Sequence, residues 1–209
     1  AHELRTPLAL MQARLELFSA EHPDVLPETA EFLSLLQEQT ERLALMTKTL
    51  LEMSDLQTVA RTDQIQLGPM IEEIFADLAP LAEKNDIMLE RKGDGTMTGN
   101  GTLIYRMLFN LTENAIKYDR PGGAVRISIS QEEKRLLIRI TDTGCGIPKE
   151  YQQSIFQPFF RVDKSRSREY GGAGLGLSLA WEIANLHGGS VWVEKSTEEG
   201  TAIAVEVPA

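Results

Sequence analysis

Apolar residues near the start of the chain recur at alternating spacings of four and three. The first run is Leu4, Leu8, Met11, Leu15 and Phe18. A second run with the same spacing is Phe32, Leu36, Gln39, Leu43, Met46, Leu50 and Met53, in which Gln39 is the one polar position. This spacing is typical of a heptad seam along one face of a helix. The stretch 19–29 between the runs contains Pro23 and Pro27, which interrupt helices. The pattern predicts a helical hairpin over residues 1–59.

Each helix of this hairpin has its own apolar stripe, and one isolated hairpin cannot bury both stripes well. A second copy of the chain would solve this by forming a dimeric four-helix bundle. The alternative is that the hairpin packs against the downstream part of the same chain. We expect the homodimer, because the two seams are narrow and sustained.

The rest of the chain mixes helical and strand periodicity. Residues 60–64 are polar and without a period, so we expect a linker there and a second domain over 65–209. The patterns predict helices at 69–85, 102–118 and about 174–187, and strands at 86–93, 124–131, 135–142, 190–196 and 201–207. Strand hairpins with helices segregated between them indicate an α/β sandwich with helices on one face of a mixed sheet. The fold class is therefore α+β.

Composition and charge narrow the classes of partner. The 209 residues carry a formal net charge of −10, which argues against nucleic acid, because that partner needs clustered cationic side chains. No apolar run approaches the ~20 residues that span a bilayer, so we expect no direct membrane contact. The single cysteine, Cys145, cannot form an intramolecular disulfide.

Two asparagines stand four residues apart on the helix expected at 102–118. Asn110 and Asn114 therefore project from one face of that helix, with Lys117 and Tyr118 one turn later. Amide oxygens are suitable ligands for Mg²⁺ that also binds ATP phosphates, so Asn114 and Asn110 are candidate metal ligands. Lys117 could contact phosphate and Tyr118 could offer a ring face to adenine. A lone asparagine would be an ordinary solvated side chain; the full string is more specific.

An aspartate and two glycines follow the strand expected at 135–142. Asp142 at the end of that strand could accept a hydrogen bond from an exocyclic amine such as the adenine N6 group. Gly144 and Gly146 would allow positive φ and a close approach of the ligand. Taken alone, the string DTGCGIP is also compatible with an ordinary Asp-x-Gly turn.

A second glycine run, GGAGLGL at 171–177, leads into the last expected helix. Backbone N–H groups at Gly172, Gly174, Leu175 and Gly176 could face an anion at the helix N-terminus. The run matches neither a P-loop nor the G-x-G-x-x-G spacing of dinucleotide folds, and a flexible loop is the alternative. The polar segment 162–169 before it is typical of a lid over a ligand, and the string FQPFFR at 156–161 places aromatic residues at its base.

His2 lies in the string AHELRTPL, beside Glu3 and shortly before Pro7. An imidazole nitrogen can attack a γ-phosphoryl group if a carboxylate takes or balances the ring proton, and Glu3 is the candidate for that role. The string begins within a helical pattern and has no cap, which suggests that the chain is part of a longer protein. His22 and His187 are interpreted as structural.

Together these strings resemble the catalytic core of bacterial sensor histidine kinases. AHELRTPL is similar to the H-box of that family, NLTENAIKY at 110–118 to the N-box and DTGCGIP to the first glycine box; FQPFFR and GGAGLGL are similar to the F-box and the second glycine box. The resemblance spans nearly the whole chain. It implies a dimerisation and phosphotransfer hairpin followed by an ATP-binding domain of the GHKL type, in the cytoplasmic portion of a membrane-anchored bacterial protein.

The resemblance also implies residue roles. His2 would be phosphorylated from ATP with Mg²⁺, Glu3 would be its general base, and the phosphate would pass to an aspartate of a response regulator receiver domain. Thr6 matches the position that orients water when such proteins dephosphorylate their regulator. Asn114, Asn110, Lys117, Tyr118 and Asp142 would bind nucleotide and metal, the glycines would shape the pocket, and Arg161 would contact phosphate or the lid.

Two positions depart from the family pattern, and two alternative functions are also compatible with the sequence. Asp119 stands where serine or threonine is common, and Asn100 where aspartate often precedes the N-box helix. Neither departure removes an expected ATP contact. The alternatives are a GHKL-type ATPase that forms no phosphohistidine, and a dimeric signalling scaffold with a vestigial ATP site.

Overall fold

The computed structural model describes residues 2–22, 25–55, 59–162 and 174–209. The chain divides into two compact units, Ala1–Leu56 and Gln57–Ala209.

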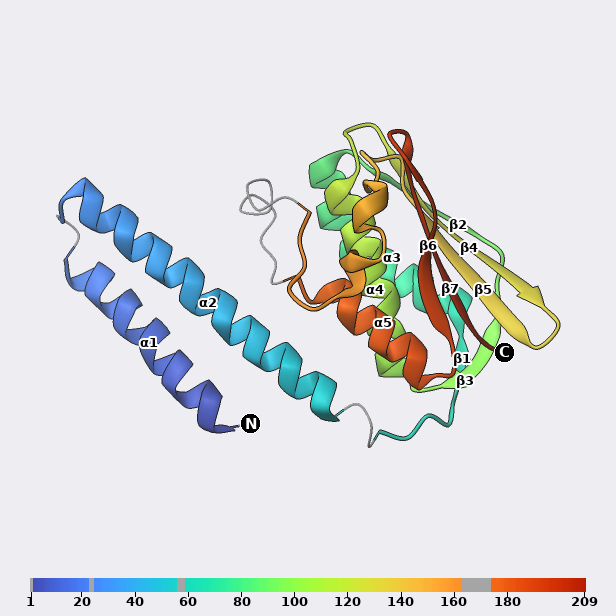
Figure 1. Ribbon diagram of the computed structural model, residues 1–209, viewed down its shortest axis with the longest axis horizontal. Helices are drawn as coiled ribbons and strands as arrows, with labels where there is room; N and C mark the ends of the chain where they lie inside the picture. The colour runs from blue at the N-terminus through green and yellow to red at the C-terminus, as the bar shows by residue number, and fades with distance from the viewer. Residues whose placement is uncertain (1, 23–24, 56–58, 163–173) are drawn as a thin grey trace. The chain divides into compact units, whose positions relative to one another are not determined.

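The first unit is a helical hairpin, as the heptad spacing predicted. Helix α1 runs from His2 to Glu21, through Pro7, and α2 from Pro27 to Asp55. The two helices lie side by side (Figure 1). Several seam residues stay exposed in the single chain, at 54% for Met11, 59% for Phe32 and 52% for Leu43. Among the described residues, no helix combines the length and apolar character that a bilayer span requires.

The second unit contains a five-stranded mixed sheet with helices on one face (Figure 1). The strand order is β2-β4-β5-β7-β6; β2 is parallel to β4 and the other neighbours are antiparallel. The strands are β2 (Met88–Lys92), β4 (Ala124–Glu132), β5 (Arg135–Thr141), β6 (Ser190–Thr197) and β7 (Gly200–Pro208). The helices are α3 (Leu67–Asn85), α4 (Gly101–Tyr118) and α5 (Gly176–Leu186). The α+β prediction is confirmed.

The core lies between these helices and the sheet. Alternate residues of each central strand face the helices, which explains the period of two in the sequence. In α4 the fully buried side chains recur at helical spacing: Ile104, Met107, Leu108, Leu111 and Ile116. They fix the rotation of α4, so that its polar asparagines lie on a different, half-buried face.

A small second sheet was not predicted. Strand β1 (Asp63–Gln66) pairs antiparallel with β3 (Thr96–Gly99). Each strand has four residues and is mostly polar, with Ile65 and Met97 as its buried apolar residues. Such strands are too short to show an alternating pattern. Asp63 and Gln64, which were assigned to the linker, belong to β1.

Two helix starts differ from the sequence prediction because of local chemistry. Helix α3 begins at Leu67, and the Asp94 carboxylate accepts a 2.8 Å hydrogen bond from the N–H of Gly68 in its first turn. Helix α5 begins at Gly176, because Gly174 has φ +70° and cannot continue a right-handed helix.

Candidate functional site

Helix α4 and the start of α5 bring the predicted amides and a predicted glycine together. A Cβ atom added to Gly176 would lie 3.6 Å from Nδ2 of Asn114 and 3.7 Å from Oδ1 of Asn110. The missing side chain therefore leaves the first turn of α5 open beside both amides. The first N–H groups of a helix have no partner within it and favour an anion.

Lys117 is one turn beyond Asn114 on α4. Its Nζ lies 2.7 Å from Oε1 of Glu113, an i,i+4 ion pair whose side chains are 18% and 30% exposed. Glu113 was not predicted as a site residue. The pair ties the lysine ammonium group to Glu113 one turn back on the same helix, and the neighbouring Tyr118 is half exposed at the end of the helix.

Asp142 follows β5 and is held by two backbone N–H groups. Gly144 donates at 2.9 Å and Thr201 at 3.0 Å, both to Oδ1 of the carboxylate. Among the described residues, both hydrogen bonds to this side chain fall on that one oxygen, so Oδ2 is available to accept from a ligand amine. Burial raises the pKa of Asp142 above its usual range, the two backbone bonds oppose this, and the charge of Asp119 adds to it.

Thr201 is a site residue that sequence reasoning missed. It lies 59 positions from Asp142 and meets it because β5 and β7 pair antiparallel, with Thr141 opposite Ala202. Without the strand pairing, nothing in the sequence connects it to Asp142.

Gly144 and Gly146 have no room for a side chain. A Cβ on Gly144 would lie 2.3 Å from the carbonyl oxygen of Tyr118, and one on Gly146 would lie 2.0 Å from that of Thr197. Gly146 also has φ +72°. These glycines let the loop after Asp142 pack directly on backbone from α4 and β6.

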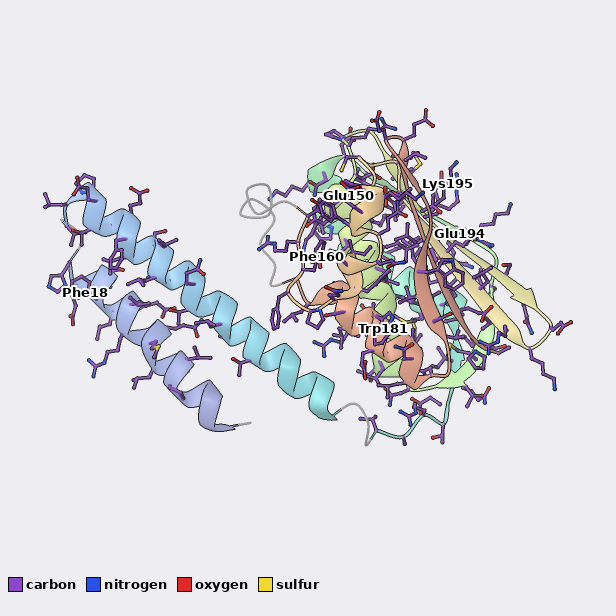
Figure 2. All side chains as sticks on the ribbon, in the orientation of Figure 1. Phe18, Glu150, Phe160, Trp181, Glu194 and Lys195 are labelled. Atoms are coloured by element: carbon purple, nitrogen blue, oxygen red, sulfur yellow. The ribbon has the colours of Figure 1, made fainter. Side chains whose placement is uncertain are left out.

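A hydrogen bond joins the aromatic string to the second glycine run. The N–H of Phe159 donates to the carbonyl of Gly174 at 2.9 Å. Phe160, labelled in Figure 2, packs at a tilt on Tyr151, with ring centroids 5.7 Å apart. Leu175 is buried directly before α5, and Arg161 is half-buried.

Several predicted residues are not covered by this geometry. Gly172 and positions 163–169 of the expected lid lie outside the described residues. His2, Glu3 and Thr6 have their backbone in α1, but their side chains lie outside the description.

His187 joins the far ends of the two site helices. Its Nε2 accepts a 3.0 Å hydrogen bond from the N–H of Asn100, and its Nδ1 donates to the carbonyl of Ile183 at 2.8 Å. This arrangement requires the neutral ring, and burial, together with Arg61, lowers its pKa. The ring is therefore structural, as predicted, and it is neutral. Asn100 also caps α4, through Leu103, and donates to the carbonyl of Ala60 at 2.9 Å.

The described side chains fit a nucleotide better than a free metal ion. No cluster of three or more histidine, cysteine, aspartate or glutamate side chains that could hold a metal occurs in the described part of the chain. Instead there is a carboxylate with one unused oxygen, two amides, a lysine and an open helix N-terminus. A divalent cation would bind here through amide oxygens together with the phosphates of its ligand.

Both parts of the chain match known families. Residues 99–209 match the family described as histidine kinase-, DNA gyrase B- and HSP90-like ATPase, and residues 1–59 match the His Kinase A (phospho-acceptor) domain. The chain is 34% identical to the sensor histidine kinase WalK of Bacillus subtilis over 218 residues, which cover 100% of this chain and 35% of WalK. It is 33% identical to the sensor histidine kinase RppB of Synechocystis over 214 residues, covering 100% of this chain and 47% of RppB.

Solved structures agree with this relationship. Histidine kinase ThkA, crystallised in complex with the response regulator protein TrrA, aligns with a TM-score of 0.68 at 25% identity, covering 100% of this chain and 59% of ThkA. Full-length ShkA, crystallised in complex with AMPPNP, aligns with a TM-score of 0.74 at 22% identity over 99% of this chain and 44% of ShkA, which shows a shared fold. The chain spans less than half of the length of the curated relatives named above.

Proposed function

The chain belongs to the sensor histidine kinases, and from that premise we propose that it is an ATP:protein-histidine phosphotransferase core. It would phosphorylate its own His2 from ATP and pass the phosphate to an aspartate of a response regulator. The observation that carries the proposal is the constellation around α4, in which Asn110 and Asn114 border the open start of α5 at Gly176. Asp142 supplies the second half of the site.

Each site residue would have a separate task in nucleotide binding. The unused oxygen of Asp142 would accept from the 6-amino group of adenine, while Thr201 and Gly144 hold the other oxygen. Tyr118 would pack near the adenine ring. Lys117, now paired with Glu113, would share its charge with phosphate. The start of α5 at Gly176 would face the phosphates, together with Gly174 and Leu175 directly before it. Gly172 and Arg161 would also contribute to phosphate binding.

Asn114, with Asn110 beside it, would hold Mg²⁺. When bound, the cation would neutralise phosphate charge and orient the phosphates. The chain's own contribution is placement, because phosphoryl transfer depends mainly on positioning and electrostatics.

In the transfer step a bond would form between an imidazole nitrogen of His2 and the γ-phosphorus, while the bond to the leaving ADP oxygen breaks. Glu3, the neighbouring carboxylate, would take or balance the proton of the ring. The phosphoryl group would then move from His2 to a carboxylate of the regulator, restoring the imidazole. The ThkA–TrrA complex supports a regulator as the partner.

Thr6 lies one helical turn after His2, and we assign it to dephosphorylation of the regulator. Thr6→Ala should weaken that phosphatase activity while sparing autophosphorylation. An equal loss of both activities would refute the assignment.

The product formed from ATP distinguishes a histidine kinase from a GHKL-type ATPase. With γ-labelled ATP and Mg²⁺, a kinase should give protein-bound label that is labile in acid and stable in base. Release of free phosphate without protein-bound label would support the ATPase, and absence of ATP binding would support the scaffold.

We further propose that the hairpin forms a homodimeric four-helix bundle and that the chain is the cytoplasmic portion of a membrane-anchored protein. The exposed seam residues support the first statement. The similarity to proteins named sensor histidine kinases supports the second.

A further inference from the structure

Asp119, directly after α4, accepts three hydrogen bonds through its carboxylate. Its Oδ1 accepts from the hydroxyl of Thr143 at 2.8 Å and from the N–H of Arg120 at 2.8 Å, and its Oδ2 accepts from the N–H of Thr143 at 3.2 Å. Both carboxylate oxygens therefore hold one residue, Thr143. Thr143 is the immediate neighbour of Asp142.

The hydroxyl group of Thr143 also connects Asp119 to strand β4. Its oxygen accepts a 3.0 Å hydrogen bond from the N–H of Ala124, the first residue of β4. Asp119 and Thr143 thus tie the end of the asparagine-bearing helix to the start of β4 and to the loop after β5. Asp142 lies where these elements meet.

Two glycines leave space for this connection. A Cβ on Gly123 would lie 2.5 Å from Oδ1 of Asp119 and 2.5 Å from Oγ1 of Thr143. On the other side, a Cβ on Gly144 would lie 3.1 Å from the Cα of Asp119. Glycine backbone therefore packs closely against Asp119 on both sides, and a side chain at either position would collide with Asp119.

The residue type at position 119 suits this role. A carboxylate accepts hydrogen bonds through both oxygens and donates none, which matches the surrounding donors. Serine or threonine has one oxygen and cannot reach both donors of Thr143 in this way. Asparagine would turn one acceptor into a donor that faces another N–H or O–H group.

We propose that Asp119 is a positioning residue for adenine recognition: by clamping Thr143, it holds the Asp142 carboxylate against Thr201 and Gly144. The inference rests on the proposed ATP site. Asp119 acts through Thr143 and does not itself touch the nucleotide. Its loss should therefore affect the reading of the adenine amine more than the binding of the phosphates.

The test compares two nucleotides in the full chain with Mg²⁺. One is ATP and the other is purine riboside triphosphate, which lacks the 6-amino group. The unchanged chain should prefer ATP by at least about tenfold, the value of one hydrogen bond to a charged group. In Asp119→Ala and Asp119→Asn, ATP affinity should fall about tenfold while the affinity for the analogue changes by less than about threefold.

Thr143→Val removes only the hydroxyl and should lower the preference for ATP partway. It keeps the inference testable if the Asp119 variants fail to fold. The matched control is Asp77→Asn, which removes a carboxylate that accepts from Tyr105 at the other end of α4, and it should leave the preference unchanged.

The binding results distinguish a failure of the proposed ATP site from a failure of the positioning role of Asp119. If the unchanged chain does not bind ATP, the proposed function fails and this inference fails with it. If the unchanged chain prefers ATP but the Asp119 and Thr143 variants keep the same preference, or lose both nucleotides equally, only the positioning role is overturned.

Discussion

At the scale of single residues, the site depends on hydrogen bonds that hold one atom and leave its neighbour unused. Asp142 is the clearest case, because Oδ1 is occupied by two backbone donors and Oδ2 is not engaged by a described residue. This asymmetry gives the carboxylate a fixed direction. A ligand amine would then meet an acceptor that needs no reorganisation.

Replacing Asp142 by asparagine should separate binding from stability. Asp142→Asn keeps an oxygen for Thr201 and Gly144 but removes the charge that would accept the adenine amine, so ATP affinity should fall about 10- to 150-fold. Because burial disfavours the charged carboxylate, the variant should unfold at the same or higher urea concentration. Titration calorimetry and tryptophan fluorescence measure the two effects, since Trp181 and Trp192 both lie in the second unit.

Glu90→Gln is the matched control for Asp142→Asn. Glu90 is paired with Arg126 on β2 and β4, and its loss should leave ATP affinity unchanged. A variant Asp142→Asn with unchanged ATP affinity would remove Asp142 from the adenine site.

The glycines of the site should differ in their tolerance of a methyl group. Gly146→Ala puts a Cβ 2.0 Å from a backbone oxygen at positive φ, so it should destabilise the second unit by about 1–3 kcal/mol. Gly176→Ala meets nothing closer than 3.6 Å and should change stability by less than about 1 kcal/mol. Urea unfolding followed by tryptophan fluorescence measures both, and equal effects would contradict the packing described here.

Residue types suggested a chemistry for the candidate site residues, but they did not suggest the contacts of those residues. Asn110, Asn114 and Asp142 were predicted as site residues from their residue type, their position on a helix or strand and their resemblance to family motifs, and the structure places the two amides beside Gly176. The hydrogen bond from Thr201 to Asp142 and those from Thr143 to Asp119 were not predicted. These contacts join elements that are distant in the sequence, so residue spacing along the chain does not predict them.

At the scale of elements, the long periodic segments were predicted and the short ones were not. Helix α4 and strands β4 and β5 were recognised because buried apolar residues repeat over several turns or alternations. The four-residue strands β1 and β3 lack such repeats, so β1 was partly assigned to a linker. The starts of α3 and α5 depend on Asp94 and Gly174, whose effect requires a tertiary contact or a backbone angle.

His187, which joins the start of α4 to the end of α5, makes the stability of the second unit sensitive to acid. Its pKa is lowered from 6.5 by burial and by Arg61, against the opposing bond to Ile183, so the unfolded chain binds a proton more readily than the folded chain. Its contribution to stability is therefore fully present above about pH 6.5 and is lost as the pH falls from there through the lowered pKa.

The measurement is the urea midpoint of the second unit at pH 7.5 and pH 5.5, in the unchanged chain and in His187→Gln. Acidification should lower the midpoint more in the unchanged chain, because only that chain titrates at position 187. An equal drop in both proteins would show that another group is responsible.

At the scale of the whole molecule, the exposed seam of the hairpin calls for a partner. Met11, Phe32 and Leu43 are each more than half exposed in the single chain. Burial in a symmetric bundle would remove this apolar surface from water, and the hydrophobic effect favours that.

Analytical ultracentrifugation of the unchanged chain should show a dimer. The double variant Phe32→Asp with Leu43→Asp should shift the equilibrium from dimer towards monomer. The surface pair Glu28→Gln with Glu31→Gln serves as control. A monomer at all accessible concentrations would contradict the proposed bundle.

The central claim is that ATP bound at the α4–α5 site phosphorylates His2. The most direct measurement is protein-bound label from γ-labelled ATP and Mg²⁺ in the unchanged chain, in His2→Gln and in Asn114→Ala, with His22→Gln as control. Acid-labile label should appear on the unchanged chain and on His22→Gln, and be absent from His2→Gln and Asn114→Ala. Label that persists in His2→Gln would place the acceptor elsewhere and contradict the account.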